Sequence, residues 1–303
     1  MERTKIKPAV EQEHKGKVTA ILTGDWHLRD STPACRTDDF EAALWRKIIY
    51  IRTLQEHYDC PILHSGDLFH NWKPSPYLLS KAMEYMPSSL FWTIYGNHDL
   101  PQHNLELADK CGIYVLLTAG VVSILTHGAQ HWGQPIPEEP FVLAGRKILV
   151  SHIMTYQGKT PYPGCTDTPA GGMLRKLKDY DLILTGHNHQ QFTETHNGRL
   201  LVNPGCITRQ EADQADFRPA VWLWYAESNT VEKHYLPIEK GVVQKPENTE
   251  RVEERNARID AFISKLNSDW DESIDFEQNL ERAITANKVS KEIQGIIYTA
   301  IES

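Results

Sequence analysis

Short apolar runs alternate with amphipathic stretches along the first half of the chain, a pattern typical of strand–helix units. Residues 17–23 are apolar enough to predict a strand. Residues 39–58 predict a helix, because apolar side chains recur there at helical spacing. The remaining expected elements are strands at 61–64 and 90–95, helices at 76–86 and around 104–110, and short strands near 113–116 and 121–125.

The second half changes to short strands separated by turn signals such as Asn197-Gly198 and Ser228-Asn229. These strands are expected at residues 147–151, 181–185, 192–195, 200–202, 221–225 and 230–235. The first half therefore indicates an α/β arrangement, and the second half is richer in strands. Two sheets packed face to face, with helices outside, would accommodate both halves.

The strand pattern stops near Gly241, which predicts a domain of residues 1–240 followed by a helical tail, 241–303. Residues 246–250 are polar and indicate a linker. Apolar stripes at helical spacing follow, including Ile259, Phe262 and Leu266. Two interpretations of the tail stay open. Its apolar face packs on the domain, or it docks a partner.

Five apolar runs end in tight turns that carry polar residues, namely TAILTGDWH, PILHSGDLFH, FWTIYGNHD, KILVSHIM and LILTGHNH. The carboxyl ends of strands in α/β sheets face the crevice where ligands bind, so these five endings should converge on one site. One histidine after one strand would more often be an ordinary loop residue; the ordered set of five endings favours a site. The candidate metal ligands are Asp25, His27, Asp67, Asn97, His152, His187 and His189.

The types of these side chains indicate the kind of metal. Carboxylate, amide-oxygen and imidazole ligands together suit Mn, Fe or Zn better than Mg or Ca, which prefer oxygen ligands throughout. A carboxylate can bridge two cations about 3.5–4 Å apart, and such a pair lowers the pKa of bound water and clamps the oxygens at phosphorus. The sequence therefore predicts two divalent ions, Mn, Fe or Zn, and phosphoester hydrolysis.

These motifs resemble those of the calcineurin-like metallophosphoesterases, over roughly residues 17–210. The resemblance implies a four-layer α/β/β/α sandwich. It also implies a division of the ligands: Asp25, His27 and His189 would hold one metal, Asn97, His152 and His187 the other, and Asp67 would bridge them. His98 would donate a proton to the leaving oxygen, with Asp99 orienting its imidazole.

Within that family, GDLFH and the Asn-Pro-Gly turn at Asn203 look most like the SbcD-like nuclease subunits of DNA repair. His70 then matches a second histidine near the scissile phosphate. This resemblance implies DNA as substrate and an SMC-like coiled-coil ATPase as partner, with a homodimer as the alternative. Such subunits usually carry a capping domain. Only about sixty residues follow the core here, so a full cap is not expected.

A long Pro- and Gly-rich segment, TYQGKTPYPGCTDTPAGG, follows His152. Long loops beside a site are often functional, so Tyr156, Lys159 and Tyr162 are expected to contact substrate. Lysine would pair with phosphate and a tyrosine would stack on a base. An ordered surface loop without a function is an equal alternative. Asn203 and Arg209 are further candidates for substrate contact, with Arg209 placed to bind phosphate.

Composition limits the location and the partners. The charged N-terminus has no apolar core, no apolar run approaches the ~18 residues that span a bilayer, and the five cysteines form no Cys-x-x-Cys pair. A cytoplasmic protein without membrane contact is expected. The 32 Lys and Arg against 40 Asp and Glu give a net charge of −8, which disfavours a broad electrostatic footprint on nucleic acid.

Three functions remain after these observations. The first is an Mn-dependent DNA exo- or endonuclease of the SbcD-like kind. The second is a phosphatase or cyclic-nucleotide phosphodiesterase that acts on small phosphoesters, which the negative charge favours. The third is a non-catalytic metal-binding scaffold, against which a complete ligand set with a proton donor argues.

Overall fold

The computed structural model describes residues 16–87, 90–160 and 165–244, with four further positions at 284, 285, 291 and 294. The chain divides into two compact units, Met1–Gln244 and Lys245–Ser303. The predicted linker at 246–250 and the predicted tail helices, apart from those four positions, lie outside the described residues.

Helix α1 (Phe40–Tyr58) begins and ends where the sequence supplies the right residues. The side chain of Asp39 accepts a hydrogen bond from the Ala42 N–H at 3.0 Å and so caps the first turn. Asp59 ends the helix in the left-handed conformation, with φ of 47°. The apolar stripe that predicted this helix is buried and comprises Phe40, Leu44, Ile48, Ile51 and Leu54.

Two shorter helices lie beside α1. Helix α2 (Pro76–Tyr85) is capped by Ser75 and starts with proline, as expected from the sequence. Helix α3 (Gly112–Thr118) corrects the predicted strand near 113–116. Its apolar run is too short to distinguish strand from helix by length. Burial decides, because Ile113 and Leu116 are buried at helical spacing while the residues between them are exposed.

The first sheet has the strand order β14-β13-β1-β2-β3-β4. Strands β1 to β4 are parallel, and β13 and β14 extend the sheet by antiparallel pairing. The bounds are β1 Ala20–Thr23, β2 Ile62–His64, β3 Phe91–Thr93, β4 Ser123–Ile124, β13 Ala220–Tyr225 and β14 Thr230–Tyr235. The predicted helix near 104–110 is a 3-10 helix, η2 (Leu105–Lys110), preceded by η1 (Pro101–His103).

The second sheet has the order β11-β12-β10-β7-β5, with β6 also paired to β7. Its strands are β5 Ala129–Gln130, β6 Phe141–Leu143, β7 Arg146–Ser151, β10 Leu182–Thr185, β11 Phe192–His196 and β12 Arg199–Asn203. Strands β5, β7, β10 and β12 are parallel, whereas β6 and β11 are antiparallel to their neighbours. The segment after His152, expected to be a loop, contains the small pair β8 (Thr155–Tyr156) and β9 (Thr168–Pro169) and the start of α4 (Ala170–Lys176).

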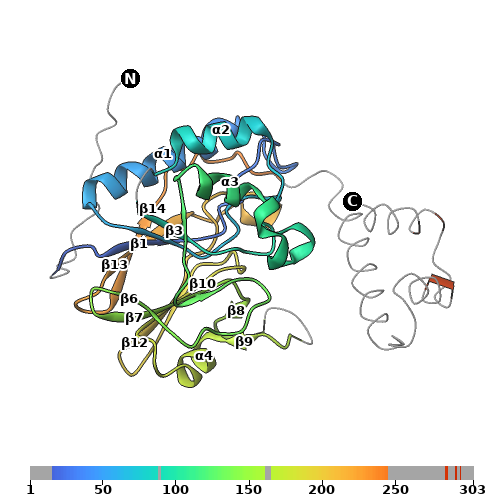
Figure 1. Cartoon of the computed structure of the whole chain (residues 1–303). Coiled ribbons are helices and arrows are strands. Elements are labelled where there is room, and N and C mark those ends of the chain that lie inside the picture. Colours follow the sequence, from blue (N-terminus) through green and yellow to red (C-terminus); the bar gives the residue numbers. More distant parts are fainter. Residues whose placement is uncertain are drawn as a thin grey trace. The chain divides into compact units, whose positions relative to one another are not determined.

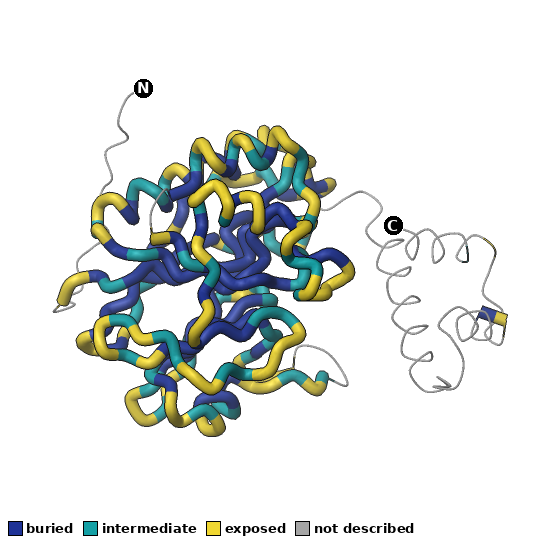
Figure 2. The backbone as a smooth tube through the Cα atoms, viewed as in Figure 1, coloured by how far each residue is buried: buried dark blue, intermediate teal, exposed yellow. Residues whose placement is uncertain are grey.

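Three hydrophobic clusters separate four layers. The first lies between α1–α3 and the first sheet, for example Leu44 against Ile21. The second lies between the two sheets, for example Leu22 with Val150. The third lies between the second sheet and α4, for example Ile183 with Met173. Figure 1 shows the helices on the outer faces of the two sheets, and Figure 2 shows the strands as the buried interior. The expected α/β/β/α sandwich is confirmed.

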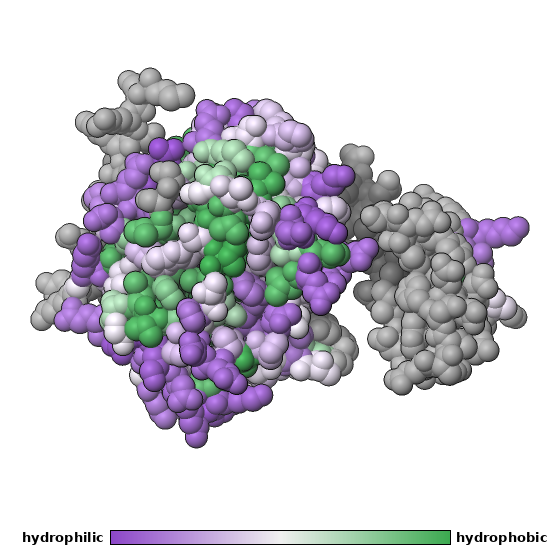
Figure 3. All heavy atoms as spheres, in the orientation of Figure 1, coloured by the Kyte–Doolittle hydropathy of each residue, from purple (hydrophilic) through white to green (hydrophobic). Residues whose placement is uncertain are grey.

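The surface carries scattered apolar residues among hydrophilic ones, as one face shows in Figure 3. Large hydrophobic side chains that are exposed in the described part include Tyr77, Met83, Tyr114 and Val142. Isolated exposures of this kind are ordinary on a protein surface. Among the described residues, no helix has the length and apolar character needed to cross a membrane.

Candidate metal centre

Every predicted ligand follows the carboxyl end of a strand. Asp25 and His27 follow β1, Asp67 follows β2, and Asn97 follows β3, all in the first sheet. His152 follows β7, and His187 and His189 follow β10, in the second sheet. Because both sheets present these ends at one edge of the sandwich, two sets of turns from different layers meet there.

The backbone at these turns has an uncommon conformation. Asp25, His27, Asp67 and His187 have φ of 49°, 45°, 55° and 72°, in the left-handed region. Such φ values are uncommon for residues with side chains, although Asp and His adopt them more readily than most. Left-handed residues of this kind cluster at functional sites, where the surrounding structure holds them in place.

Asp25, His27 and His189 form one group, with their candidate ligand atoms all within 4.8 Å of one another. Nε2 of His27 lies 3.0 Å from Nε2 of His189. One carboxylate oxygen of Asp25 accepts the His187 N–H at 3.0 Å, while its second oxygen, Oδ2, is buried with no hydrogen-bond partner among the described residues. A buried carboxylate oxygen without a donor is costly unless a cation supplies the missing contact.

Asp67, His152 and His187 form a second group by the same 4.8 Å criterion. Asn97 belongs with them, because its Oδ1 lies 3.1 Å from Nε2 of His152 and 3.0 Å from Nδ1 of His187. Nδ1 of His152 donates to the Ser65 carbonyl at 2.7 Å, which leaves Nε2 directed at the group.

The carboxylate of Asp67 lies between the two groups. Its Oδ1 accepts the backbone N–H of His98 at 3.0 Å. Its Oδ2 lies 3.3 Å from Nε2 of His152 and 3.6 Å from Nε2 of His27, so one oxygen faces both groups. The imidazole, amide and carboxylate ligands, together with the unpartnered Asp25 oxygen, fit a pair of divalent ions bridged by Asp67.

The charges in this region need compensation when no cation is bound. Burial raises the pKa of Asp25 to about 6, although His152 and His189 act in the opposite direction. Burial lowers the pKa of His152, but Asp67 and Asp25 raise it by more, to about 9. Asp67, also buried, has its pKa lowered far below the usual range by His152 and His27. The carboxylates and His152 thus stabilise one another's charged forms.

Small residues allow the turns to pack closely. A Cβ on Gly96 would lie 2.1 Å from Oδ1 of Asp67, and one on Gly66 would lie 2.7 Å from Nδ1 of His152. Gly66 also has φ of +95°, which side chains rarely adopt. The Gly-Asp and Gly-Asn motifs are therefore required by close approach as well as by turn geometry.

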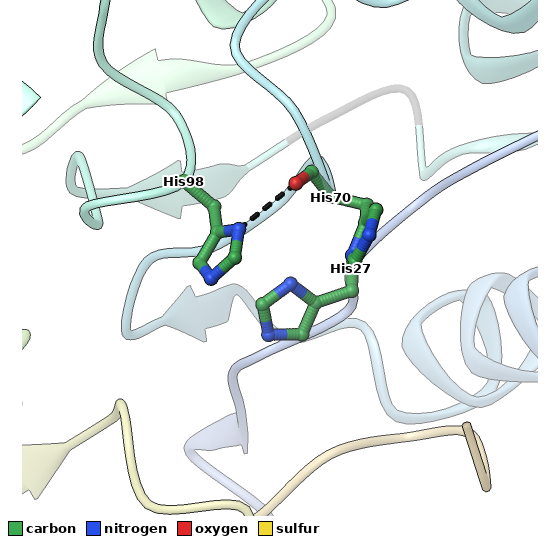
Figure 4. Close-up of side chains that lie close together, drawn as sticks. All are labelled: His27, His70 and His98. Carbon is green, nitrogen blue, oxygen red and sulfur yellow. Dashed lines mark hydrogen bonds between the residues drawn. The ribbon is translucent and has the colours of Figure 1, made fainter. Parts of the chain in front are cut away.

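A third histidine group lies beside the first. His27, His70 and His98 have candidate ligand atoms within 4.8 Å of one another, and the His70 and His98 rings stack with centroids 5.6 Å apart. Figure 4 shows the three imidazoles gathered together, with Nδ1 of His98 bonded to the backbone oxygen of His70 at 2.9 Å. This contact holds the His98 ring.

The expected role of Asp99 is corrected by these contacts. Its buried carboxylate accepts backbone N–H groups of Asp67, Phe69 and Gly96 at 2.8, 3.0 and 2.9 Å. Among the hydrogen bonds of the described residues, none joins Asp99 to the His98 ring, which is oriented by the His70 carbonyl instead. Asp99 therefore ties the β2 and β3 turns together and does not orient the imidazole.

Two predicted substrate contacts are also corrected. Asn203 is fully buried, and its amide donates to the carbonyls of Asn188 and Gln190, both at 2.6 Å. Arg209 is 4% exposed, and its guanidinium donates to the carbonyls of Ala215 and Glu239. Both polar side chains are used inside the protein, so neither is available to substrate.

The other predicted contacts lie in the segment after β7. Tyr156 is half-buried in β8, and Lys159 is exposed. Neither lines the cavity beside the histidines. Tyr162 lies outside the described residues. The proposed roles of the first two stay predictions.

The structure adds residues that the sequence reasoning missed. The Trp132 ring lies 5.1 Å from that of His187 and 6.1 Å from that of His152, so it covers the second group. It follows β5, a strand of two residues without a recognisable pattern. Arg29 and Gln210 line the cavity next to His70 and His98. No spacing rule would have pointed to Arg29, because Asp25 and His27 have left-handed φ and the chain before Arg29 is therefore not extended.

A family model described as the calcineurin-like phosphoesterase superfamily domain matches residues 21–221. A comparison with curated protein sequences found no match.

Similar solved structures include an archaeal phosphodiesterase, with 14% identity over 72% of this chain and 99% of that chain and a TM-score of 0.40. A metallophosphoesterase from Sphaerobacter thermophilus shares 12% identity over 73% and 89%, with a TM-score of 0.37. Vacuolar protein sorting 29 from Cryptosporidium parvum shares 15% over 73% and 97%, with a TM-score of 0.35.

Proposed function

The chain belongs to the calcineurin-like phosphoesterase superfamily, and on this premise we propose that it cleaves phosphodiester bonds in DNA. It is a metal-dependent phosphoesterase hydrolase. The proposal is an exo- or endonuclease of the SbcD-like kind, with Mn as the preferred metal. An SMC-like ATPase partner or a homodimer stays a prediction.

The observation that carries the proposal is the third histidine group, which adjoins the ligand groups. His70 and His98 line a cavity of about 190 Å³ together with His27 and His189. A phosphodiester differs from a monoester by a second esterified group, which needs room beside the reacting phosphorus. The cavity supports this requirement, because it adjoins the ligands while its walls extend beyond them.

The ligand set assigns the metals to named residues. Asp25, His27 and His189 would hold one ion, Asn97, His152 and His187 the other, and Asp67 both. When bound, the ions supply Lewis-acid activation of water and stabilise charge on the phosphoryl oxygens. The protein's own contribution is to hold these side chains and to provide a proton to the leaving oxygen.

His98 is the proposed proton donor. Its Nδ1–H donates to the His70 carbonyl, so the remaining ring nitrogen, Nε2, is the one that gains and releases a proton. His70 is less suited to this role. Burial and the nearby charge of Arg29 lower the pKa of His70 to about 4, which keeps it neutral near pH 7.

A second candidate is hydrolysis of small phosphoesters, including cyclic nucleotides. The net charge of −8 favours it, because an acidic protein gains little from long-range attraction to DNA. The two candidates share the metal centre and differ in what extends from the scissile phosphate.

One panel separates the candidates. The purified chain with Mn is tested on single- and double-stranded DNA, bis-p-nitrophenyl phosphate, p-nitrophenyl phosphate and cyclic nucleotides. We expect cleavage of DNA and of the diester. Cleavage of cyclic nucleotides with intact DNA would overturn the proposal in favour of the second candidate, and failure on every substrate with Mn, Fe and Zn would indicate a scaffold.

The role of His98 is tested by His98→Ala. Loss of a general acid typically reduces turnover by about 10²–10⁴-fold, while both metals should still bind because His98 is outside the two ligand groups. Metal content and turnover on bis-p-nitrophenyl phosphate are the measurements. His127→Ala, at an exposed histidine paired with Glu139, is the matched control. Metal loss with retained turnover would contradict the assignment.

A further inference from the structure

The cavity beside the histidine group has one wall that the proposed chemistry leaves unused. Its lining includes Arg29, Thr208, Gln210 and Gln214. Arg29 is close to the histidines because an isolated bridge between Leu28 and Phe69 continues the pairing of β1 and β2 beyond their ends. The two chains therefore leave the sheet side by side, and Arg29 emerges next to His70.

The guanidinium of Arg29 is held in place by neutral oxygens. Its Nε donates to Oγ of Ser31 at 3.0 Å and its Nη1 to Oε1 of Gln210 at 3.3 Å. Gln210 is itself fixed, because its amide donates to Oγ1 of Thr208 at 2.7 Å and its backbone N–H donates to Gln214 at 2.7 Å. The side chain is half-buried and positioned before any ligand arrives.

The charge of Arg29 is not neutralised by an ion pair, as four other arginines are. Arg36, Arg46, Arg52 and Arg146 pair with Asp38, Glu239, Glu56 and Asp181. No ion pair within the described part of the chain includes Arg29. Burial lowers its pKa, yet a guanidinium stays protonated under all ordinary conditions. Two carboxylates are near: Asp30 acts on Arg29 through space, and Glu211 lines the same cavity. Neither forms an ion pair with the guanidinium, so a fixed cation without a direct counter-ion lines the cavity. Such a cation is suited to bind an anion, and a guanidinium fork matches phosphate oxygens in particular.

The position of Arg29 determines which phosphate it would meet. The scissile phosphate would lie at the ligand groups, from which only His27 and His189 line this cavity. The guanidinium of Arg29 is bonded to Ser31 and Gln210, which are not ligands. His70 and His98 stand in the same cavity and would face the reacting phosphate. An anion held by Arg29 beside Gln210 would then be a separate group of the same substrate.

We propose that Arg29, positioned by Gln210, forms a subsite for a second phosphate of the substrate, adjacent to the phosphate that is cleaved. The proposal rests on the phosphodiesterase function above. A second phosphate is present in a polynucleotide and also in a nucleoside diphosphate ester, and the subsite chemistry is the same for both. Small esters with one phosphate would not use it.

The test compares wild type and an Arg29 variant on substrates that carry one or two phosphates. The substrates are TpT, which has one phosphate, and pTpT and TpTp, which carry one more at the 5′ or the 3′ end. TppT, in which two thymidines are joined through a diphosphate, represents a small-molecule nucleoside diphosphate ester. Wild type and Arg29→Ala are compared with Mn by kcat/KM. We expect the preference for one of the two-phosphate substrates over TpT to fall roughly 10- to 100-fold in the variant, as for loss of a charge-assisted hydrogen bond.

Further variants separate binding from folding. Arg29→Lys keeps the charge without the planar fork and should restore part of the preference. Arg46→Ala removes an exposed arginine that pairs with Glu239 and should keep the full preference. Thermal unfolding and turnover of bis-p-nitrophenyl phosphate report on the fold and the metal centre of each variant.

The outcomes are distinct. A preference that is equal in wild type and Arg29→Ala, or an equal loss on TpT and on all two-phosphate substrates, overturns the subsite while the phosphodiesterase stands. A preference confined to the diphosphate assigns the subsite to small molecules, and one confined to pTpT or TpTp assigns it to nucleic acid. Wild-type protein that hydrolyses neither these substrates nor bis-p-nitrophenyl phosphate overturns the proposed function itself.

Discussion

Lys47 is a buried cation on the inner side of α1. Lys47 is 4% exposed, and its ammonium group donates a hydrogen bond to the Ala43 carbonyl at 3.2 Å. Burial, followed by the like charges of Arg36, Arg209 and Arg46, lowers the pKa of Lys47 to about 8. Asp38 is the neighbouring anion, but Arg36 already holds its carboxylate.

Replacing this lysine is expected to stabilise the protein. Near pH 7 the folded state must keep Lys47 charged in a buried position, at a cost on the order of 1–3 kcal/mol. Lys47→Met keeps the length without the charge and should raise the free energy of unfolding by that amount in urea titrations at pH 7.

The effect of Lys47 on stability should depend on pH. Between about pH 8 and the unfolded value of 10.5, the unfolded state binds the proton and the folded state does not, so wild-type stability rises with pH. The advantage of Lys47→Met should therefore shrink at pH 9.5. An advantage that is constant with pH would show that packing, not charge, is responsible.

At the residue scale, the sequence was a better guide to the metal ligands than to the residues that contact substrate. Asp25 and Asp67 stand in motifs whose order and spacing carry information beyond residue type. Asn203 and Arg209 stand near the same motifs, and their residue types suit substrate equally well. Which carbonyls they meet is decided by tertiary packing, and neither spacing nor residue type encodes that.

The turn that carries His187 and His189 is held at two of its carbonyls by the side chain of Asn203. Asn203, at the end of β12, accepts from Oγ1 of Thr185 at 2.9 Å and donates to two carbonyls of the turn. It acts as a clamp between β10, β12 and the ligand turn. Its influence on chemistry is thus through the position of the histidines.

Asn203→Ala is expected to weaken metal binding. Loss of a residue that orients ligands typically costs about 10- to 100-fold in metal affinity. Two turn carbonyls would also lose their donors, which lowers the free energy of unfolding by about 1–3 kcal/mol. Calorimetric metal titration and urea unfolding measure the two effects.

Asn229 provides a matched control at the opposite end of the sheet. Its amide donates to the carbonyls of Asp181 and Gly198 at 2.8 and 2.9 Å, and its oxygen accepts from Nε1 of Trp224 at 3.1 Å. Asn229→Ala should lose at least as much stability, because Asn229 also has a left-handed φ of 51° that alanine adopts less readily, and it should keep its metal affinity. An equal loss of affinity in both variants would show that Asn203 has no special role at the metal centre.

At the element scale, capped and amphipathic segments were predictable and short ones were not. Helix α1 has both an Asp cap and an apolar stripe, and the helix expected at 39–58 is confirmed. Helix α3 has seven residues and no side-chain cap, so local sequence left its type open, and the strand expected there is wrong. Strands β5 and β8 have two residues each and depend on their neighbours.

For the whole molecule, metal binding should appear as added stability. An ion that binds the folded chain alone at 100 times its Kd contributes about 2.7 kcal/mol. For a domain of this size that corresponds to a rise in Tm of roughly 5–10 °C. Thermal unfolding with Mn and with a chelator measures the difference.

Asp25→Asn is the control for this effect. Burial raises the pKa of Asp25 to about 6, so the neutral amide suits the metal-free protein and the variant should fold. It should lose most of the Mn-dependent rise in Tm. A rise as large as that of wild type would show that Asp25 does not hold a metal.

The candidate ligands come from both sheets, so bound metals would also join the sheets mechanically. Asp25, Asp67 and Asn97 are attached to one sheet, and His152 and His187 to the other. Elsewhere the two sheets are joined by apolar side chains, whose contacts are lost as soon as the sheets move slightly apart. Ions bound by ligands from both sheets would cross-link the two sheets at this edge. Under a pulling force that parts the sheets, the loaded protein should therefore rupture at a higher force than the chelated one, with the break located at this edge.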